Sequence, residues 1–290
     1  MINVLVTGSN GQLANCIKDR AKQQKGLHFI YTDYQELNIC NLNDVEAFFK
    51  TNQKIDYCIN CAAYTAVDKA ETEVEKAFEI NAQGAKNLAL VCDEQGAVLI
   101  HVSTDFVFDG DKTEPYTETD IPKPISVYGA SKLQGEVEIQ KTLKKHFIIR
   151  TSWLYSEHGA NFMKTMLRLA ETRDEISVVS DQIGTPTYAG DLADVILKII
   201  NSKNTNFGLY HYSNEGVASW YDFAKAIFEG SNLKIKTTPI KTEAYPTPAK
   251  RPVYSVMDKR KIINTLKITA PNWQDSLSKT INLYKKQTIE

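Results

Sequence analysis

The sequence predicts an α/β fold, a doubly wound parallel sheet with helices on both faces. Three observations support this prediction. Short apolar runs alternate with longer segments of helical period, as in successive β-α-β units. The apolar runs are hydrophobic nearly throughout, which is typical of strands covered on both faces. The first run also passes directly into a glycine-bearing turn, TGSNG at 7–11, before the next helical segment.

The first half of the chain alternates strand and helix. Each predicted strand is a short run rich in β-branched and aromatic residues, and each predicted helix repeats its apolar residues every three or four positions. The predicted strands are 2–8, 27–33, 56–63, 97–105 and 147–155, and the predicted helices are 10–24, 42–53, 74–96 and 128–146.

The rhythm changes after residue 155, where helices dominate and the connections lengthen. AYPTPAKRPVYSVMD is too rich in proline for a regular element. Helices are predicted at 161–173, 191–202, 219–230 and 276–286, strands within 176–188 and 208–214, and an irregular loop at 244–258.

Composition narrows the class of protein. The 290 residues are 42% hydrophobic and 24% charged, as in an ordinary globular protein, and the net charge of −1 disfavours a nucleic-acid partner. No apolar run is long enough for a membrane span, so we expect no membrane association. The five cysteines are odd in number and lie in apolar segments, which favours a reducing cytoplasm over a disulfide framework.

No metal site is predicted. Cys58 and Cys61 form a lone C-x-x-C without a second pair at zinc spacing, and the five histidines show no metal-binding pattern. We interpret both cysteines as buried strand residues.

The turn after the first strand carries small residues three apart, at Gly8, Gly11 and Ala14. Glycines at such a turn let the backbone approach a pyrophosphate, while the helix N-terminus offers N–H groups and a positive dipole. Glycine turns occur in many β-α connections, but this one opens the first unit of a doubly wound pattern. It therefore predicts dinucleotide binding.

Asp33 ends the second predicted strand, at the distance from the glycines where an acid accepts hydrogen bonds from an adenosine ribose. The alternative is a strand-end carboxylate that only meets water. A carboxylate at the ribose disfavours a 2′-phosphate, and no arginine stands beside it, so Asp33 favours NAD over NADP.

These features together predict two domains. We expect an NAD(P)-binding Rossmann-like domain over 1–155. A smaller, interwoven, mainly substrate-binding part should cover 156–290, with about 185–215 returning to the first domain. A ligand would bind in the cleft between them.

Tyr128 and Lys132 lie one helical turn apart in VYGASK at the start of a predicted helix. Most pairs at this spacing are only neighbours on a solvated face. Here the chemical alternative is a phenol whose proton transfer is assisted by an ammonium, which should lower the pKa of Tyr128. Thr104, at the end of the fourth predicted strand, could hydrogen-bond a substrate carbonyl.

Taken in order, the motifs resemble the extended short-chain dehydrogenase/reductase superfamily, and within it the dTDP-4-dehydrorhamnose reductases. The resemblance covers nearly the whole chain. Tyr-x-x-x-Lys alone is common in the superfamily, whereas STDFVF, RTSW and DQIGTPTY in this order are more specific. The matching segments are TGSNGQL (7–13), CAAYTAVDKAE (61–71), INAQGAKNLA (80–89), HVSTDFVFDG (101–110), VYGASKLQGE (127–136), RTSWLY (150–155), NFMKTMLRLA (161–170), DQIGTPTY (181–188) and AKRPVYS (249–255).

The resemblance implies reduction of the 4-keto group of dTDP-4-dehydro-L-rhamnose to dTDP-L-rhamnose, with NADPH or NADH, in nucleotide-sugar and cell-surface polysaccharide biosynthesis. A homodimer is a further expectation. Asn81 matches an Asn that completes a water-linked relay to the lysine in related enzymes. The implied catalytic residues are Thr104, Tyr128 and Lys132, and the substrate-facing residues are Thr104, Asp105 and Trp153. The implied cofactor-binding residues are Gly8, Asn10, Gly11, Gln12, Leu13, Asp33, Asn38, Ile39, Ala62, Ala63, Tyr64, Thr65, Tyr128 and Lys132.

Two departures from the family pattern stand out. Ala14 replaces a common Gly, and Asn38 in LNIC replaces an acid near the adenine. Some relatives are associated with magnesium, but no carboxylate cluster here suggests it. Trp220 and Phe223, at helical spacing, are interpreted as packing residues.

Two alternatives stay open at this stage. The first is another nucleotide-sugar epimerase or dehydratase of this fold, although dehydratases carry Asp-Glu where this chain has Asp105 and Phe106. The second is a non-catalytic subunit like the regulatory subunit of methionine adenosyltransferase.

Overall fold

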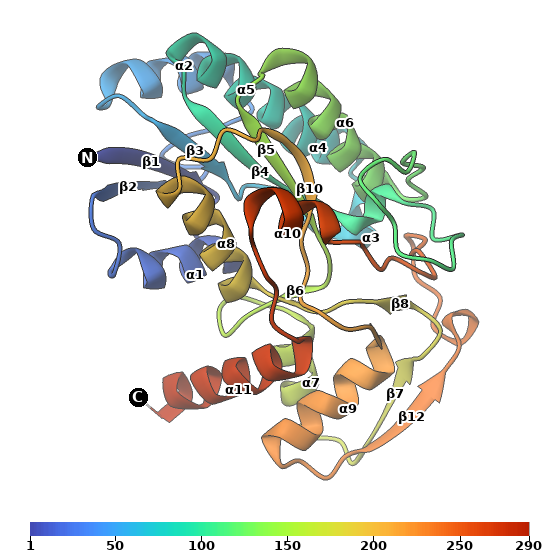
Figure 1. The fold of residues 1–290 in the computed structure, drawn as a ribbon. Coiled ribbons are helices and arrows are strands. Elements are labelled where there is room, and N and C mark those ends of the chain that lie inside the picture. Colours follow the sequence, from blue (N-terminus) through green and yellow to red (C-terminus); the bar gives the residue numbers. More distant parts are fainter. Residues whose placement is uncertain (290) are drawn as a thin grey trace.

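The computed structural model describes residues 1–289 and contains a six-stranded parallel sheet in the order β10-β5-β4-β3-β1-β2. All five neighbouring pairs run parallel, so the carboxyl ends of the strands meet at one edge. The predicted fold class is confirmed (Figure 1). The strands are β1 (Ile2–Thr7), β2 (Leu27–Thr32), β3 (Tyr57–Asn60), β4 (Val98–Thr104), β5 (His146–Thr151) and β10 (Gly208–His211).

Helices cover both faces of this sheet, as the apolar strands require. Two separate buried clusters result, one on each side. One face carries α2 (Leu42–Thr51), α5 (Gly84–Gln95) and α6 (Val127–Thr142), and the other carries α1 (Gln12–Ala21), α8 (Ala189–Asn201) and α10 (Arg260–Leu266) (Figure 1).

The single helix predicted over 74–96 is interrupted. It consists of α4 (Val74–Phe78), a π-helical turn η1 (Glu79–Gln83) and α5. The wider turn contains Asn81, whose side chain bonds to groups outside the helix. Periodicity does not reveal such a turn, because one wide turn hardly changes the apolar pattern. Short turns α3 (Val67–Ala70) and η2 (Asp105–Val107) follow β3 and β4.

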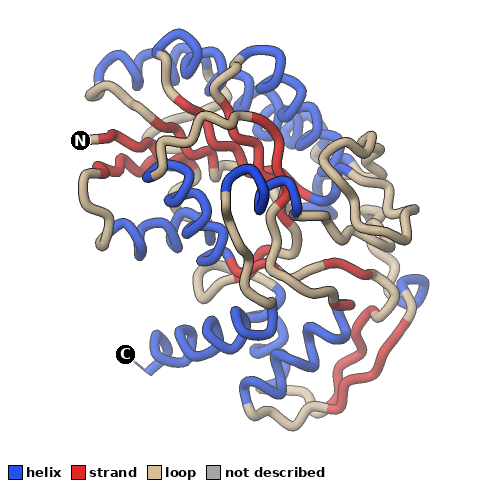
Figure 2. The backbone as a smooth tube through the Cα atoms, in the orientation of Figure 1, coloured by secondary structure: helices blue, strands red, loops and turns tan. Residues whose placement is uncertain are grey.

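The C-terminal part forms a second, smaller layer beside the sheet (Figure 2). Its core joins α7 (Phe162–Ala170), α9 (Trp220–Ser231) and α11 (Trp273–Ile289). Its strands form three two-stranded sheets: β7 (Glu175–Val179) with β12 (Lys236–Ile240), β8 (Ile183–Gly184) with β11 (Ala218–Ser219), and β6 (Leu154–Tyr155) with β9 (Thr187–Tyr188). β12 was not predicted, since KTTPI lacks an apolar pattern and contains a proline.

The chain crosses between the two parts more than once. α8 and β10, both within 185–215, and also α10, pack in or on the large sheet. The division at residue 155 itself stays a prediction.

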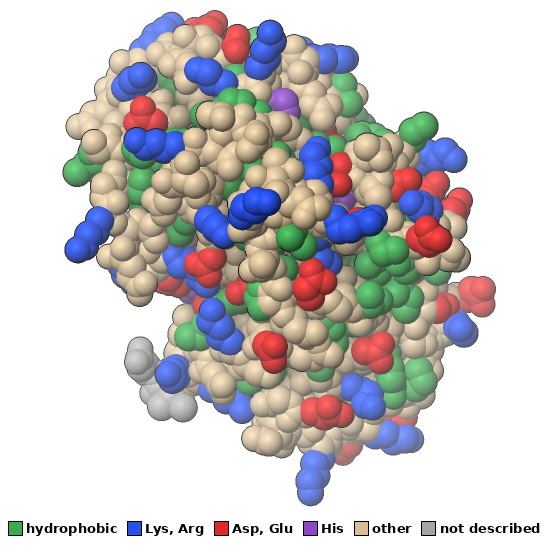
Figure 3. All heavy atoms as spheres, in the orientation of Figure 1, with side chains coloured by type: hydrophobic (Ala, Val, Ile, Leu, Met, Phe, Trp, Pro, Cys, Tyr) green, Lys and Arg blue, Asp and Glu red, His purple; other side chains and the backbone are tan. Residues whose placement is uncertain are grey.

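Charged side chains of both signs are spread over one face of the molecule (Figure 3). Lys, Arg, Asp and Glu are intermixed over the face shown in Figure 3. No helix within residues 1–289 has the length and apolar character needed to cross a membrane.

Candidate active site

One cavity of about 830 Å³ opens at the carboxyl ends of the parallel strands. It lies where open α/β sheets bind ligands, and its volume is within the usual range for ligand sites. Residues from both parts of the chain line it, from Gly8 in the first turn to Trp220 and Arg251 near the end.

The glycine turn has the geometry that a close backbone approach requires. Gly8 adopts φ +64°, and a Cβ there would lie 2.6 Å from the backbone of Ala62. Gly11 is the residue before α1, and its N–H donates to the Gly8 carbonyl at 3.0 Å. The first N–H groups of α1 therefore border the cavity beside a turn that only glycine fits. This arrangement suits a dinucleotide pyrophosphate.

Asp33 follows β2 and lines the far end of the same cavity. Its carboxylate accepts the N–H of Asn10 at 2.9 Å and that of Tyr34 at 2.8 Å. The carboxylate is thus tied to the glycine turn before any ligand arrives. It is half-buried and keeps acceptor capacity for a ribose hydroxyl.

Most of the predicted cofactor residues line this cavity, and one does not. Tyr64 packs in a small cluster with Ala70 and Ala77, and its hydroxyl donates to Glu73 at 2.9 Å. Its side chain is therefore directed at the helices and does not line the cavity, and a contact between Tyr64 and the cofactor stays a prediction. The predicted residues that line the cavity are Gly8, Asn10, Gly11, Gln12, Leu13, Asp33, Asn38, Ile39, Ala62, Ala63, Thr65, Tyr128 and Lys132.

Asn81 braces this region from the π-helical turn. Its Oδ1 accepts the Tyr64 N–H at 2.8 Å, and its Nδ2 donates to the Tyr64 carbonyl at 3.0 Å and to Ser131 Oγ at 2.9 Å. Ser131 in turn donates to the carbonyl of Tyr128 at 2.8 Å. Asn81 thus fastens the loop after β3 to the helix of Tyr128 and Lys132. A relay through water to Lys132 stays a prediction.

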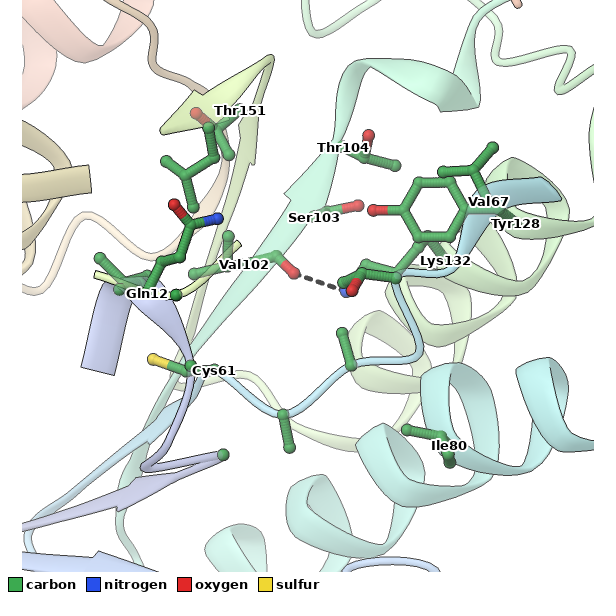
Figure 4. A pocket seen from close by; sticks show the side chains of 18 of the residues that line it. Gln12, Cys61, Val67, Ile80, Val102, Ser103, Thr104, Tyr128, Lys132 and Thr151 are labelled. Atoms are coloured by element: carbon green, nitrogen blue, oxygen red, sulfur yellow. Dashed lines mark hydrogen bonds between the residues drawn. The ribbon is translucent and has the colours of Figure 1, made fainter. Parts of the chain in front are cut away.

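The helix α6 presents Tyr128 and Lys132 to the cavity. Ser126 caps the helix by accepting the N–H of Gly129 at 3.2 Å. A Cβ on Gly129 would lie 2.1 Å from the carbonyl of Phe106, so only glycine lets α6 approach the end of β4 this closely. Figure 4 shows Tyr128, Thr104 and Ser103 on one side of the cavity, with Gln12 and Thr151 opposite.

The predicted direction of the Tyr128 pKa is wrong for this structure. Burial raises the pKa of Tyr128 to about 12, against the smaller lowering effect of the Thr104 hydroxyl. Burial also lowers the pKa of Lys132 to about 8, although Glu136 acts in the opposite direction. Desolvation, which sequence spacing does not report, thus outweighs the expected effect of the ammonium on the phenol.

Thr104 and Asp105 stand together at the end of β4. Thr104 Oγ1 donates to Asp105 Oδ1 at 3.1 Å and accepts the Phe106 N–H at 3.2 Å. The Oδ2 atom of Asp105 is buried and has no partner at hydrogen-bonding geometry in the described structure, although the nearby Ser255 hydroxyl acts to lower the pKa of this carboxyl. Burial raises the pKa of Asp105 to about 6. A buried acceptor at a cavity wall is suited to a substrate hydroxyl.

Trp153 reaches the cavity from the segment after β5. Its φ of +47° is rare for a bulky residue. Its ring stacks on Trp220 at 3.7 Å between centroids, and a Cβ on Gly184 would lie 2.7 Å from it. Strained residues of this kind gather at functional sites. Trp220 also lines the cavity, so it is both a packing residue, as predicted, and a wall of the site, whereas Phe223 is core.

Arg251 is a cavity residue that sequence reasoning did not assign a role. Its guanidinium pairs with Asp68 through two bonds, Nη1 to Oδ1 at 3.0 Å and Nη2 to Oδ2 at 2.8 Å. Arg251 and Lys132 are the only cations among the described residues that line the cavity. The only sequence signal for Arg251 is that it lies in AKRPVYS (249–255), one of the segments that carry the family resemblance. The position of an arginine in a loop far along the chain from the other cavity residues does not otherwise reveal that it lines the cavity.

Among residues 1–289, one group of side chains is spaced so that it could hold a metal ion, and it does not line this cavity. Ligand atoms of Cys16, Glu157 and His158 lie within 4.8 Å of one another. Burial raises the pKa of the Cys16 thiol far above its usual range, which disfavours the thiolate that metals bind. His158 also already contacts Asp19 at 2.7 Å. We assign no ion to this group.

The parallel sheet and the glycine turn at its carboxyl edge define a Rossmann-like α/β fold of the kind that binds dinucleotides. Solved structures of this type share the fold at low identity. UDP-glucose 4-epimerase from Thermotoga maritima superposes with a TM-score of 0.83 at 20% identity over 100% of both chains.

Closer relatives define the family. Residues 2–286 match the family described as RmlD substrate binding domain. The dTDP-4-dehydrorhamnose reductase of Aggregatibacter actinomycetemcomitans is 42% identical over 98% of this chain and 99% of its own. The crystal structure of the dTDP-4-dehydrorhamnose reductase from Clostridium acetobutylicum has a TM-score of 0.94 at 45% identity, covering 98% of this chain and 100% of that one. That of Bacillus anthracis, in complex with NADP, has a TM-score of 0.93 at 40% identity, with the same coverage. The chain belongs to the dTDP-4-dehydrorhamnose reductase family.

Proposed function

We propose that this protein reduces the 4-keto group of dTDP-4-dehydro-L-rhamnose to dTDP-L-rhamnose, with NADPH or NADH as the reductant. One observation carries the proposal. A single cavity holds a glycine turn fit for a dinucleotide at one end and Thr104, Tyr128 and Lys132 at the other. A cofactor and a carbonyl substrate would thereby meet beside a proton donor.

The residues would divide the work as follows. The reduced nicotinamide, when bound, supplies the hydride. Tyr128 donates its phenolic proton to the substrate oxygen, and its pKa of about 12 keeps it protonated beforehand at neutral pH. The Thr104 hydroxyl, which donates to Asp105 in this structure, would turn to donate to the same oxygen. The unpartnered Oδ2 of Asp105 accepts a sugar hydroxyl, and Trp153 supplies an apolar wall.

Arg251 would bind the diphosphate of the substrate. A sugar nucleotide brings negative phosphate charge into the cavity, and a planar guanidinium pairs with phosphate through two bonds. Lys132 is buried at the catalytic end, which leaves Arg251 for this role. On substrate binding, the guanidinium would either retain its hydrogen bonds to Asp68 or replace them with hydrogen bonds to phosphate. Arg251→Gln should raise the KM for the sugar nucleotide with a smaller effect on kcat.

The direct test mixes the purified protein with dTDP-4-dehydrorhamnose and NADPH or NADH, and follows nicotinamide absorbance. Turnover that disappears in the Tyr128→Phe variant supports the proposal. An epimerase would instead copurify with tightly held NAD and give no net oxidation of cofactor. A regulatory subunit would show no turnover but bind a partner enzyme. Either result overturns the proposed reaction.

We also propose a cytoplasmic location for this protein. All five cysteines are free, which supports a reducing, cytoplasmic setting. A homodimer and the absence of a nucleic-acid partner stay predictions.

A further inference from the structure

A chain of buried hydrogen bonds runs from the glycine turn to Lys132, and its first link fixes an amide. Oδ1 of Asn60 accepts the Thr7 hydroxyl at 2.7 Å and the backbone N–H of Ala62 at 3.1 Å. A backbone N–H can only donate, so the atom facing it must be the amide oxygen. Asn60 is only 1% exposed, which leaves no solvent to relieve the reverse orientation.

The second link fixes the tautomer of a histidine. Asn60 Nδ2 lies 3.0 Å from Nδ1 of His101 on β4. The amide nitrogen has only hydrogens to offer, so Nδ1 must accept, and the proton of the neutral imidazole must lie on Nε2. An imidazolium would place a second N–H against the amide. Burial and the charge of Lys132 also hold the pKa of His101 well below its usual range.

The third link reaches the lysine. His101 Nε2 lies 3.3 Å from Lys132 Nζ, so the imidazole N–H is directed at the amine. An ammonium has three donors and no acceptor, and this contact is repulsive for it. A neutral amine has a lone pair that accepts the N–H. The other contact, from Nζ to the Val102 carbonyl at 2.6 Å, can be made by either form (Figure 4).

The remaining groups around Lys132 do not cancel this preference. Glu136, one turn later on α6, favours the ammonium, but it is already paired with Arg150 at 2.6 Å. Cys61 after β3 is uncharged, because burial raises the pKa of its thiol to about 12. Tyr128 on α6 is also uncharged at neutral pH. The charge of Asp105, at the end of β4, helps to raise the pKa of Tyr128 and so favours the uncharged phenol. His146 on β5 acts on His101 and disfavours its protonation.

We propose that His101 is a positioning residue that prepares Lys132 to return a proton to Tyr128 after each reduction, a role that rests on the proposed function. The O–H bond of Tyr128 breaks as its proton goes to the substrate oxygen, which leaves a phenolate. An N–H bond of the Lys132 ammonium then breaks, and its proton restores the phenol. The electron pair left on Nζ accepts the His101 N–H, and solvent later reprotonates the amine. The proton moves from a group with a pKa of about 8 to one of about 12, which is downhill.

Asn60→Asp tests the tautomer with little change of shape. The new carboxylate still accepts from Thr7 and Ala62, but its second oxygen can only accept from His101. The proton must then move to Nδ1, and Nε2 becomes an acceptor for the ammonium. In ¹⁵N NMR spectra, His101 should be the Nε2–H tautomer in the wild type and the Nδ1–H tautomer in Asn60→Asp. A wild-type Nδ1–H tautomer or an imidazolium overturns the proposal, whether or not the protein reduces the sugar.

Activity gives the second readout. In the wild type, kcat for reduction should fall as pH rises through about 8, since the ammonium is the form that returns the proton. Both Asn60→Asp and His101→Phe should move this falling limb of the pH–kcat profile to higher pH by about one unit. The matched control is His28→Phe, at an exposed histidine, which should leave the limb in place.

The double variant separates the tautomer from simple charge. The carboxylate introduced by Asn60→Asp changes the pKa of Lys132 by changing the tautomer of His101. This effect is lost once His101 is replaced by phenylalanine. Adding Asn60→Asp to His101→Phe should therefore shift the limb little further. A full additional shift, or an unmoved limb in both single variants, contradicts the role of His101. Absence of turnover with the expected NMR result rejects the reaction and leaves the tautomer standing.

Discussion

The two ends of the cavity differ in the environment that they give to ionisable side chains. At the Asp33 end, a half-buried carboxylate accepts the backbone N–H of Asn10 in the glycine turn and that of its neighbour Tyr34. At the Tyr128 end, the amine of Lys132 and the carboxyl of Asp105 are buried beside the half-buried Tyr128, and the pKa values of the phenol, the amine and the carboxyl are displaced to about 12, 8 and 6. One end is thus organised for recognition and the other for proton transfer. Desolvation is the largest cause of all three displaced pKa values at the Tyr128 end.

The largest effect is expected at the proton donor. Tyr128→Phe should lower kcat by at least ~10²-fold, the usual lower range for a lost general acid. Cofactor affinity should change little, because the recognition end is untouched. Steady-state kinetics and cofactor titration measure the two. Tyr221→Phe, on α9, is the control and should keep full activity. Turnover close to wild type in Tyr128→Phe would remove this residue from the mechanism.

Lys132→Met should show that the catalytic end is built at a cost to stability. Turnover should fall by about 10-fold or more, because the amine assists proton transfer. The KM for cofactor should rise as well, because the amine is also expected to bind the cofactor. At neutral pH the free energy of unfolding should increase by about 1 kcal/mol or more, since a buried ammonium is removed.

The sign follows from linkage. The folded-state pKa of Lys132 lies below its unfolded value, so the penalty is present below pH 8 and is relieved between about 8 and 10.5. The gain of Lys132→Met should therefore shrink as pH rises through that window in chemical denaturation. Lys141→Met, exposed on the same helix, should show neither effect. A variant less stable than wild type at every pH would mean that the lysine is not strained by burial.

Asp105→Asn should have a moderate, pH-dependent effect. The ionised carboxylate accepts a substrate hydroxyl, so kcat/KM should rise with pH around 6 in the wild type. The asparagine variant should lose about 3- to 10-fold at neutral pH, in line with one hydrogen bond, and show no such rise. Asp109→Asn, on the same loop, should keep the wild-type profile. Persistence of the rise in Asp105→Asn would assign it to another group.

The two ends also differ in how well the sequence predicts them. The glycine turn, Asp33 and the Tyr128–Lys132 spacing are local patterns, and the structure brings them to one cavity. Burial is a property of the whole packed molecule, and so the rise in the Tyr128 pKa was predicted with the wrong sign. The side chain of Tyr64 packs outside the cavity, which the sequence does not reveal because a loop register alone does not say which way a residue points.

Features that depend on distant segments were also missed. Arg251 reaches the cavity from a proline-rich loop and meets Asp68 across most of the chain. The positive φ of Trp153 and its stack on Trp220 need the C-terminal layer to be in place. The π-helical turn at Asn81 leaves the apolar period almost unchanged. Each of these is a tertiary effect that a single sequence does not encode locally.

The smallest effect is expected at Asp33, and it tests the recognition end directly. A 2′-phosphate beside this carboxylate would meet a like charge, so NADH should serve at least as well as NADPH. Asp33→Ala removes that repulsion and also a hydrogen bond to the ribose of NADH. The ratio of kcat/KM values should move several-fold toward NADPH, with kcat at saturating cofactor nearly unchanged. Because Asp33 also accepts the Asn10 N–H, Asp33→Asn is the companion variant, which removes the charge but retains an acceptor. It should relieve repulsion while keeping the turn in place. A strong wild-type preference for NADPH that neither variant alters would mean that Asp33 only braces the turn and does not face the ribose.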